Sequence, residues 1–239
     1  SVLKIAVNDL HLNTIYWTYI ISKTFFFISR TFFPFSITRC NIHLSEVQKM
    51  LYNISSMITK YFFKKYIITN SDHEVFIYGC QLIISSFCSI SSILLLSFFI
   101  NITYGILFLL FFIPIRLFCG GFHASSYIKC FLCTNTIFIM TLFCSLSLVD
   151  CNKYILVGIC CYFFYYILTN APIIHANNPL SESEARRNKL HTKKVIIIEL
   201  IIINLFLIFN IQIALSIAIT TTFFVYFLMK ISNLWKRGF

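Results

Sequence analysis

The residues best suited to chemistry lie in one short polar segment. Residues 116–133 read Arg-Leu-Phe-Cys-Gly-Gly-Phe-His-Ala-Ser-Ser-Tyr-Ile-Lys-Cys-Phe-Leu-Cys and separate two apolar runs. His123 and Cys130 are seven residues apart, so a helix over this stretch would place them on one face, about 10 Å from each other. A Cys–His pair can form a thiolate–imidazolium nucleophile, and the cations Arg116 and Lys129 would stabilise the thiolate.

Two glycines precede the histidine. Gly120 and Gly121 lack side chains and permit positive φ, so they predict the end of the preceding helix and a close approach of the backbone to a ligand. Such a fold-back is needed if His123 is to contact Cys130 directly. Backbone N–H groups near the glycines are candidates for an oxyanion hole.

Two other interpretations of the same segment remain open. In the first, His123 is an interfacial histidine, Cys130 is one more apolar cysteine and the glycines only stop a helix. In the second, Cys119, His123, Cys130 and Cys133 form a Cys-x3-His-x6-Cys-x2-Cys array that could supply four zinc ligands. Against zinc, Cys119 ends an apolar helix, and buried thiolates are costly to desolvate without the metal. We therefore expect no cofactor.

The composition identifies the medium in which the segment must work. The chain has 239 residues, of which 59% are hydrophobic and 11% charged, whereas soluble domains carry roughly 25% charge. This excludes an ordinary soluble domain and predicts a polytopic, all-α membrane protein. The Lys and Arg residues that give the net charge of +11 lie between the apolar runs. This placement favours a role in membrane topology over nucleic-acid binding. Most of the ten cysteines fall inside those runs, so we expect no structural disulfides.

About six transmembrane or re-entrant helices, with a range of four to six, are expected from the apolar runs. They lie near Phe76–Ile100, Thr103–Phe118, Ile128–Leu148, Tyr154–Ala171, Val195–Phe209 and Ile211–Met229. The last two runs are continuous and too long for one crossing, so a turn is expected at Asn210 and Gln212. Glu199, inside the fifth run, predicts tight packing against protein.

The first part of the chain is expected to lie outside the membrane core. Residues 1–49 are interpreted as an N-terminal extension. Ile15–Phe35 is either an interfacial segment, because Lys23 and Arg30 interrupt it, or part of a leader or extension that has no role of its own. The i, i+3, i+4, i+7 spacing of apolar residues from Val47 predicts an amphipathic helix on the membrane surface. Residues 50–239 are then the membrane domain.

The cations predict the orientation of this domain. They gather before the first run, between the second and third, between the fourth and fifth, and after the last. With six crossings all four segments lie on one side, so the positive-inside rule places both termini and the 117–129 and 172–194 loops in the cytoplasm. The expected location is the cell membrane, with the polar segment on its inner side.

The polar segment also resembles a known signature. The stretch Arg116…Gly120-Gly121-Phe122-His123-Ala124…Cys130 is similar to that of the accessory gene regulator B (AgrB) family, the membrane cysteine endopeptidases of Gram-positive quorum sensing. Further similarities lie in Tyr78-Gly79, Asn170-Ala171-Pro172 and Asn178-Pro179-Leu180…Arg186-Arg187. The resemblance covers about residues 50–239.

This resemblance implies a thiol protease that processes an autoinducing peptide. Cys130 would be the nucleophile and His123 the general base, while Arg116, Gly120 and Gly121 would support or position the reaction. The enzyme would cleave the C-terminal part of an AgrD-type precursor through a thioester and allow cyclisation to a thiolactone or lactone.

The implied partner is a precursor peptide with an amphipathic helix and an acidic C-terminal tail. The basic residues expected to attract that tail are Arg186, Arg187, Lys189, Lys193 and Lys194. The resemblance also implies a homodimer. A non-enzymatic peptide exporter or transporter is the alternative of another class, although no internal repeat is seen.

Overall fold

The computed structural model describes residues 37–64, 73–120, 126–173 and 181–237. The predicted interfacial segment Ile15–Phe35 lies outside these residues. The chain divides into two compact units, Ser1–Met50 and Leu51–Phe239. Of the first unit, the described part is the beginning of helix α2.

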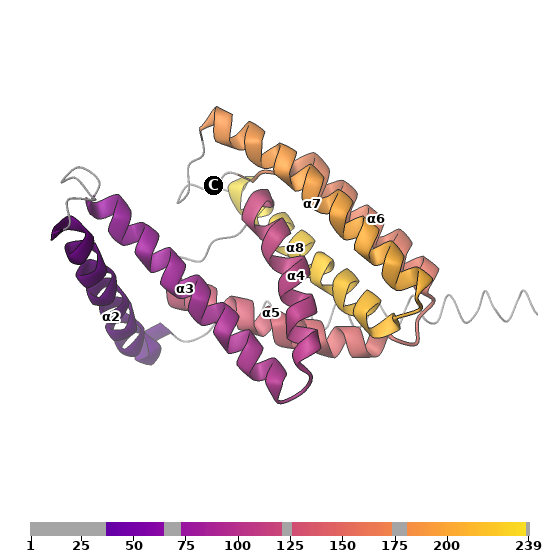
Figure 1. The fold of residues 1–239 in the computed structure, drawn as a ribbon, viewed down its shortest axis with the longest axis horizontal. Coiled ribbons are helices and arrows are strands. Elements are labelled where there is room, and N and C mark those ends of the chain that lie inside the picture. The colour runs from indigo at the N-terminus through magenta and orange to yellow at the C-terminus, as the bar shows by residue number, and fades with distance from the viewer. Residues whose placement is uncertain (1–36, 65–72, 121–125, 174–180, 238–239) are drawn as a thin grey trace, which may run out of the picture. The chain divides into compact units, whose positions relative to one another are not determined.

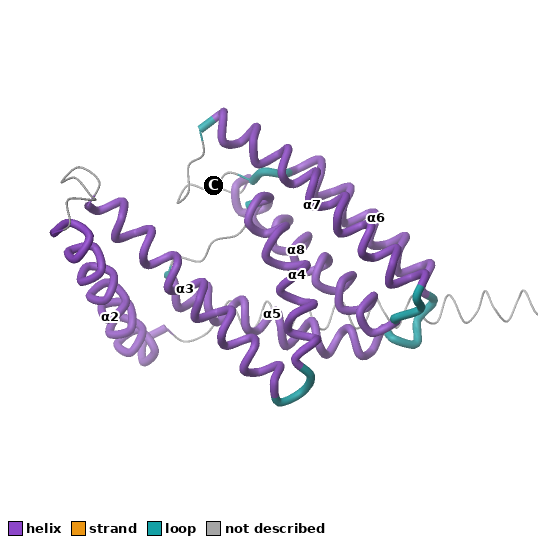
Figure 2. The backbone as a smooth tube through the Cα atoms, viewed as in Figure 1, coloured by secondary structure: helices purple, strands orange, loops and turns teal. Residues whose placement is uncertain are grey.

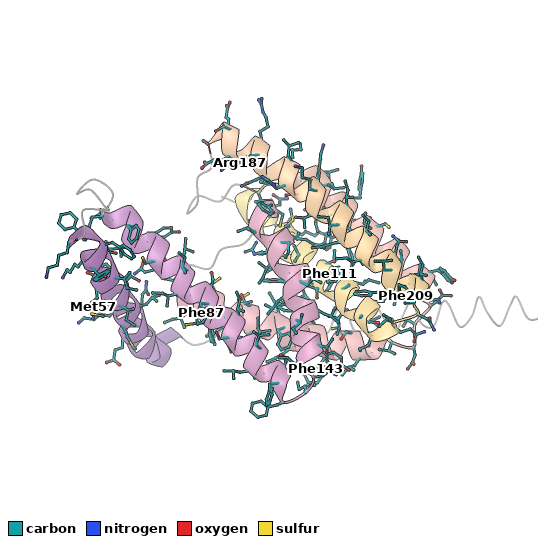
Figure 3. All side chains as sticks on the ribbon, viewed as in Figure 1. Met57, Phe87, Phe111, Phe143, Arg187 and Phe209 are labelled. Carbon is teal, nitrogen blue, oxygen red and sulfur yellow. The ribbon has the colours of Figure 1, made fainter. Side chains whose placement is uncertain are left out.

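Helix α2 extends over Ile37–Lys64 and includes the amphipathic helix expected from Val47 onward. Its apolar residues are only partly covered, since Met57 and Tyr61 are exposed. Figure 3 labels Met57 on this helix. Near its end, the ring of Phe62 lies 5.5 Å from that of Phe76, which follows in the next helix. The exposed apolar side chains are those expected of a helix that meets a membrane surface.

Five of the described helices are long and apolar enough to cross a membrane. They are α3 (His73–Phe98), α4 (Ile102–Cys119), α5 (Tyr127–Leu148), α6 (Lys153–Asn170) and α8 (Gln212–Arg237), all seen in Figure 1. The described residues contain no β-strand, only one isolated β-bridge, as the helical tube in Figure 2 makes clear. The chain is a multi-pass membrane protein of the all-α class, as the composition predicts.

Helix α7 (Glu182–Ile208) corrects one sequence prediction. The 172–194 segment was expected to be a loop, with a helix only from Val195. Instead α7 begins at Glu182, because Ser181 and Glu184 form a capping box: each side chain pairs with the other's backbone N–H. The cations of this segment therefore lie on a helix whose first half is polar and whose second half is apolar.

The turn predicted between the last two apolar runs is confirmed. Helix α7 ends at Ile208, Asn210 has a positive φ of 55°, and α8 starts at Gln212. The Lys153 ammonium group donates a 2.9 Å hydrogen bond to the Asn210 side chain, which ties the turn to the start of α6. Asparagine tolerates this left-handed conformation better than the branched residues around it.

Helix α8 is the central helix of the second unit. It contacts α4, α5, α6 and α7 (Figure 1), and residues 214–222 form an uninterrupted buried run. Three consecutive threonines, Thr220, Thr221 and Thr222, donate hydrogen bonds of 2.7–2.9 Å to carbonyls one turn earlier. Their hydroxyls are thereby satisfied without water.

Glu199 lies on the α7 side of this core, and the prediction that it packs against protein is confirmed. Its side chain is 3% exposed. Neither carboxyl oxygen has a hydrogen-bond partner among the residues that the structure describes.

Close contacts of α3, α4 and α5 fix the elements that carry the polar segment. Gly105 of α4 is buried against α3, where an added Cβ would collide with the Ser97 side chain. The ring of Phe108 lies 5.2 Å from that of Phe138 and joins α4 to α5. The Asn135 side chain on α5 accepts a 2.9 Å hydrogen bond from Ser92 on α3. The end of α4 and the beginning of α5 are thus held by packed helices.

Candidate active site

The end of α4 is built around Gly120. The helix stops at Cys119, and Gly120 follows with φ 68° and ψ −143°, a conformation open essentially to glycine alone. The Arg116 guanidinium, one turn earlier, donates a hydrogen bond to the Gly120 carbonyl. The glycine therefore stops the helix, as predicted, and the arginine holds its carbonyl in place.

A distant segment fixes the same glycine from the other side. Ile173, which follows α6, forms a parallel β-bridge with Gly120, and its N–H donates to the Cys119 carbonyl at 2.9 Å. A Cβ added to Gly120 would lie 2.5 Å from the Ile173 carbonyl oxygen. Sequence reasoning did not predict this pairing; its only signal was the resemblance of Asn170-Ala171-Pro172 to a family pattern.

Cys130 is placed by the first turn of α5. Ser126 is the N-cap: its hydroxyl accepts a 3.3 Å hydrogen bond from the Lys129 N–H. The Cys130 N–H donates to the Ser126 carbonyl at 3.1 Å, so Cys130 lies where the helix hydrogen bonding begins. One turn later, Thr134 donates its hydroxyl proton to the Cys130 carbonyl at 3.0 Å. These contacts hold the backbone of the candidate nucleophile.

Arg116 and Cys130 meet at one small cavity. Its volume is about 30 Å³, enough for about one water molecule or a carbonyl oxygen. The residues that line it are Phe112, Arg116, Cys130, Cys133, Thr134, Ile137 and Leu228. A thiol and a guanidinium group, contributed by α5 and α4, therefore share a site with mostly apolar walls.

Gly121 and His123 lie outside the described residues. The pairing of His123 with Cys130 accordingly stays a prediction. The described residues establish both ends of the connecting segment. Gly120 accepts a hydrogen bond from Arg116 and Ser126 accepts one from the Cys130 N–H, and both Arg116 and Cys130 line the cavity.

The zinc interpretation gains no support from the described thiols. Cys119 is fully buried and donates from its sulfur to the Gly120 carbonyl at 3.4 Å. It is not among the residues that line the cavity with Cys130 and Cys133. Within the described ranges, no three His, Cys, Asp or Glu side chains gather as a metal site; His123 lies outside them.

The predicted tail-binding cations occupy the polar first half of α7. Arg186, Arg187, Lys189, Lys193 and Lys194 are all exposed, and Figure 3 shows Arg187 projecting at the beginning of the helix. Arg186, Arg187 and Leu190 border an open surface depression of about 520 Å³ together with Glu182 and Ser183. Hydrogen bonds from the Ser181 backbone and hydroxyl lower the pKa of Glu184 and hold its carboxylate in the cap. The face is basic overall.

These features define a class of protein. It is an all-α, multi-pass membrane protein in which a thiol at a helix start shares a cavity with an arginine that contacts the glycine ending the preceding helix. A family model described as accessory gene regulator B matches residues 55–230. The chain belongs to the accessory gene regulator B family, whose members are involved in autoinducer peptide processing and secretion. No curated protein and no solved structure matches the chain.

Proposed function

We propose that the protein is a membrane cysteine endopeptidase that cleaves the C-terminal part of a quorum-sensing precursor peptide. The observation that carries the proposal is the shared cavity of Cys130 and Arg116, next to the Arg116–Gly120 contact. A neighbouring guanidinium is one of the groups that stabilise a thiolate, the nucleophilic form of cysteine. Family membership supplies the substrate class.

In the first chemical step the Cys130 sulfur attacks the scissile carbonyl. His123 takes the thiol proton and returns it to the departing amine, leaving an acyl-enzyme thioester on Cys130. Backbone N–H groups near Gly120 and Gly121 are in the right part of the chain to stabilise the oxyanion. The Gly120 carbonyl is already engaged by Arg116, so the orientation of this peptide unit is set before substrate binds.

The size of the cavity limits what can enter it. A volume of about 30 Å³ is large enough for the reacting carbonyl group and too small for a large side chain of the precursor. The remainder of the peptide must lie along the membrane surface outside. The apolar walls from Phe112, Ile137 and Leu228 keep bulk water away from the thioester.

Exclusion of water favours ring closure over hydrolysis. A thiol or hydroxyl within the bound precursor attacks the Cys130 thioester, the acyl–sulfur bond breaks and the enzyme thiol is regenerated. When the attacker is a thiol, one thioester replaces another, so the exchange is close to neutral in energy. The product is a thiolactone or lactone ring.

The basic face of α7 is the proposed contact for an acidic precursor tail, in an orientation that puts this face in the cytoplasm. We expect the double variant Arg186→Gln/Arg187→Gln to lower kcat/KM roughly 10-fold at low salt, because steering by these charges accelerates encounter. The difference should nearly vanish at 1 M salt, where the Debye length is about 3 Å.

The matched control for this pair is Lys60→Gln, an exposed cation on α2. It should leave kcat/KM close to the wild-type value at both salt concentrations. If kcat/KM of the double variant is unchanged at low salt, the cations of α7 take no part in substrate recognition.

The function itself is tested with purified protein in lipid vesicles and a synthetic precursor that has an amphipathic helix and an acidic tail. We expect release of the C-terminal fragment. Mass spectrometry should then detect a cyclic product that is one water lighter than its linear form. Vesicle uptake of an intact peptide without any cleavage would instead identify a transporter.

A further inference from the structure

Cys130 has a second thiol beside it in the same cavity. Cys130-Phe131-Leu132-Cys133 is a Cys-x-x-Cys sequence within α5, and both sulfur-bearing residues line the cavity with Arg116. Residues three apart on a helix share one face, with Cβ atoms roughly 5–6 Å apart. Both side chains are partly exposed, unlike Cys119 and Cys160, which are buried.

This spacing is close to that of a disulfide. Two Cα atoms three residues apart in an α-helix are separated by about 5 Å, inside the 4.4–6.8 Å range of disulfides. The Cβ atoms must approach by about 1–2 Å to reach the usual separation of about 3.8 Å. The cavity of about 30 Å³ gives the two side chains room for this adjustment.

We propose that Cys130 and Cys133 form a reversible disulfide, so that this Cys-x-x-Cys pair is a modification site at which hydroperoxides switch the peptidase off. The loss of activity rests on the proposed function, since the disulfide consumes the Cys130 thiol that acts as the nucleophile. The pairing itself rests only on the positions of the two thiols. At a cytoplasmic membrane face, thiols are held reduced and such disulfides are transient and regulatory.

The oxidation balances with a hydroperoxide as the oxidant. The Cys130 thiolate attacks the peroxide, an S–O bond forms, the O–O bond breaks, and water or an alcohol leaves after taking up a proton. The Cys133 sulfur then attacks the resulting sulfenic acid. The S–S bond forms, the S–O bond breaks, and the hydroxide that leaves takes the Cys133 proton as water. Two thiols have lost two electrons, and a dithiol reductant returns them.

The test uses the full chain in lipid vesicles, treated with hydrogen peroxide and then with dithiothreitol. After alkylation of free thiols, mass spectrometry of the peptide containing Cys130 and Cys133 should show an unalkylated, internally bridged form. Precursor cleavage should be lost in parallel, and dithiothreitol should restore both thiols and cleavage.

Two variants distinguish a Cys130–Cys133 disulfide from unspecific oxidation of the protein. The activity of each variant after peroxide is compared with the activity of the same variant before treatment. In Cys133→Ser the Cys130 sulfenic acid has no resolving thiol, so prolonged peroxide should carry it to a sulfinic acid that dithiothreitol does not rescue. Cys144→Ser, on the same helix but away from the cavity, should recover as the wild type does. If Cys133→Ser folds poorly, the wild-type mass spectrum still decides.

Either of two results overturns the proposal. One is a wild-type peptide in which both cysteines stay alkylatable after peroxide. The other is a bridge from Cys130 to a different cysteine. Absence of precursor cleavage before any oxidation would contradict the proposed function instead, and the bridged peptide would still be detected.

Discussion

Replacement of Cys130 with alanine is expected to abolish precursor cleavage while the protein still folds and inserts into the membrane. The thiol is the atom that would form the thioester, and loss of a nucleophile lowers kcat by about 10⁴-fold or more. The side chain is small and only partly buried, and its backbone contacts to Ser126 and Thr134 do not involve the sulfur. The fold should therefore survive the substitution. Cleavage is measured by release of the C-terminal fragment from vesicles of matched protein content.

Cys144→Ala is the control for this result. It removes a thiol from the same helix, also partly buried, at a position that does not line the cavity. Cleavage by this variant should remain near the wild-type level. Full processing by Cys130→Ala would remove the protease interpretation, whatever the behaviour of the other cysteines.

The second large effect is expected from Gly120→Ala. The new residue would have to adopt φ 68° and ψ −143°, which by itself disfavours the native backbone by about 1–3 kcal/mol. Its Cβ would also lie 2.5 Å from the Ile173 carbonyl oxygen, a backbone atom that cannot rotate away. The pairing of 119–120 with 173 should break, and with it the Arg116–Gly120 contact. We expect cleavage to be lost and the thermal unfolding temperature in detergent to fall.

Gly158→Ala provides the comparison. Gly158 lies within α6, and an added Cβ there has nothing within 4 Å. Alanine also favours the helix over glycine, so the unfolding temperature should be unchanged or slightly higher. If Gly120→Ala and Gly158→Ala behave alike, Gly120 has no role in positioning the site.

The sequence predicted the parts of the fold that depend on local pattern. Five of the six predicted apolar runs form helices long and apolar enough to span a membrane, whereas Val195–Phe209 forms the second half of α7, which is not among them. The turn at Asn210 lies where two polar residues interrupt a long apolar stretch. The burial of Glu199 was predicted because this one charged residue lies inside an apolar run. Each of these needs only hydropathy and a few neighbouring residues.

What the sequence could not supply were relations between distant residues. The pairing of Gly120 with Ile173 joins the ends of α4 and α6 and depends on how the helices pack. Hydropathy alone does not indicate the start of α7, because the helix begins with polar residues after the capping box of Ser181 and Glu184. For the site, spacing singled out Arg116 and Cys130, but only packing could bring them to one cavity.

The most direct test of the account is detection of the acyl-enzyme. A precursor that lacks its internal ring-closing nucleophile is mixed with the protein in vesicles, quenched in acid and analysed by intact and peptide mass spectrometry. The N-terminal precursor fragment should be found attached to Cys130 through a bond that hydroxylamine cleaves. Cleavage of the precursor with no adduct at any time point, or with the fragment attached to another residue, would contradict the account.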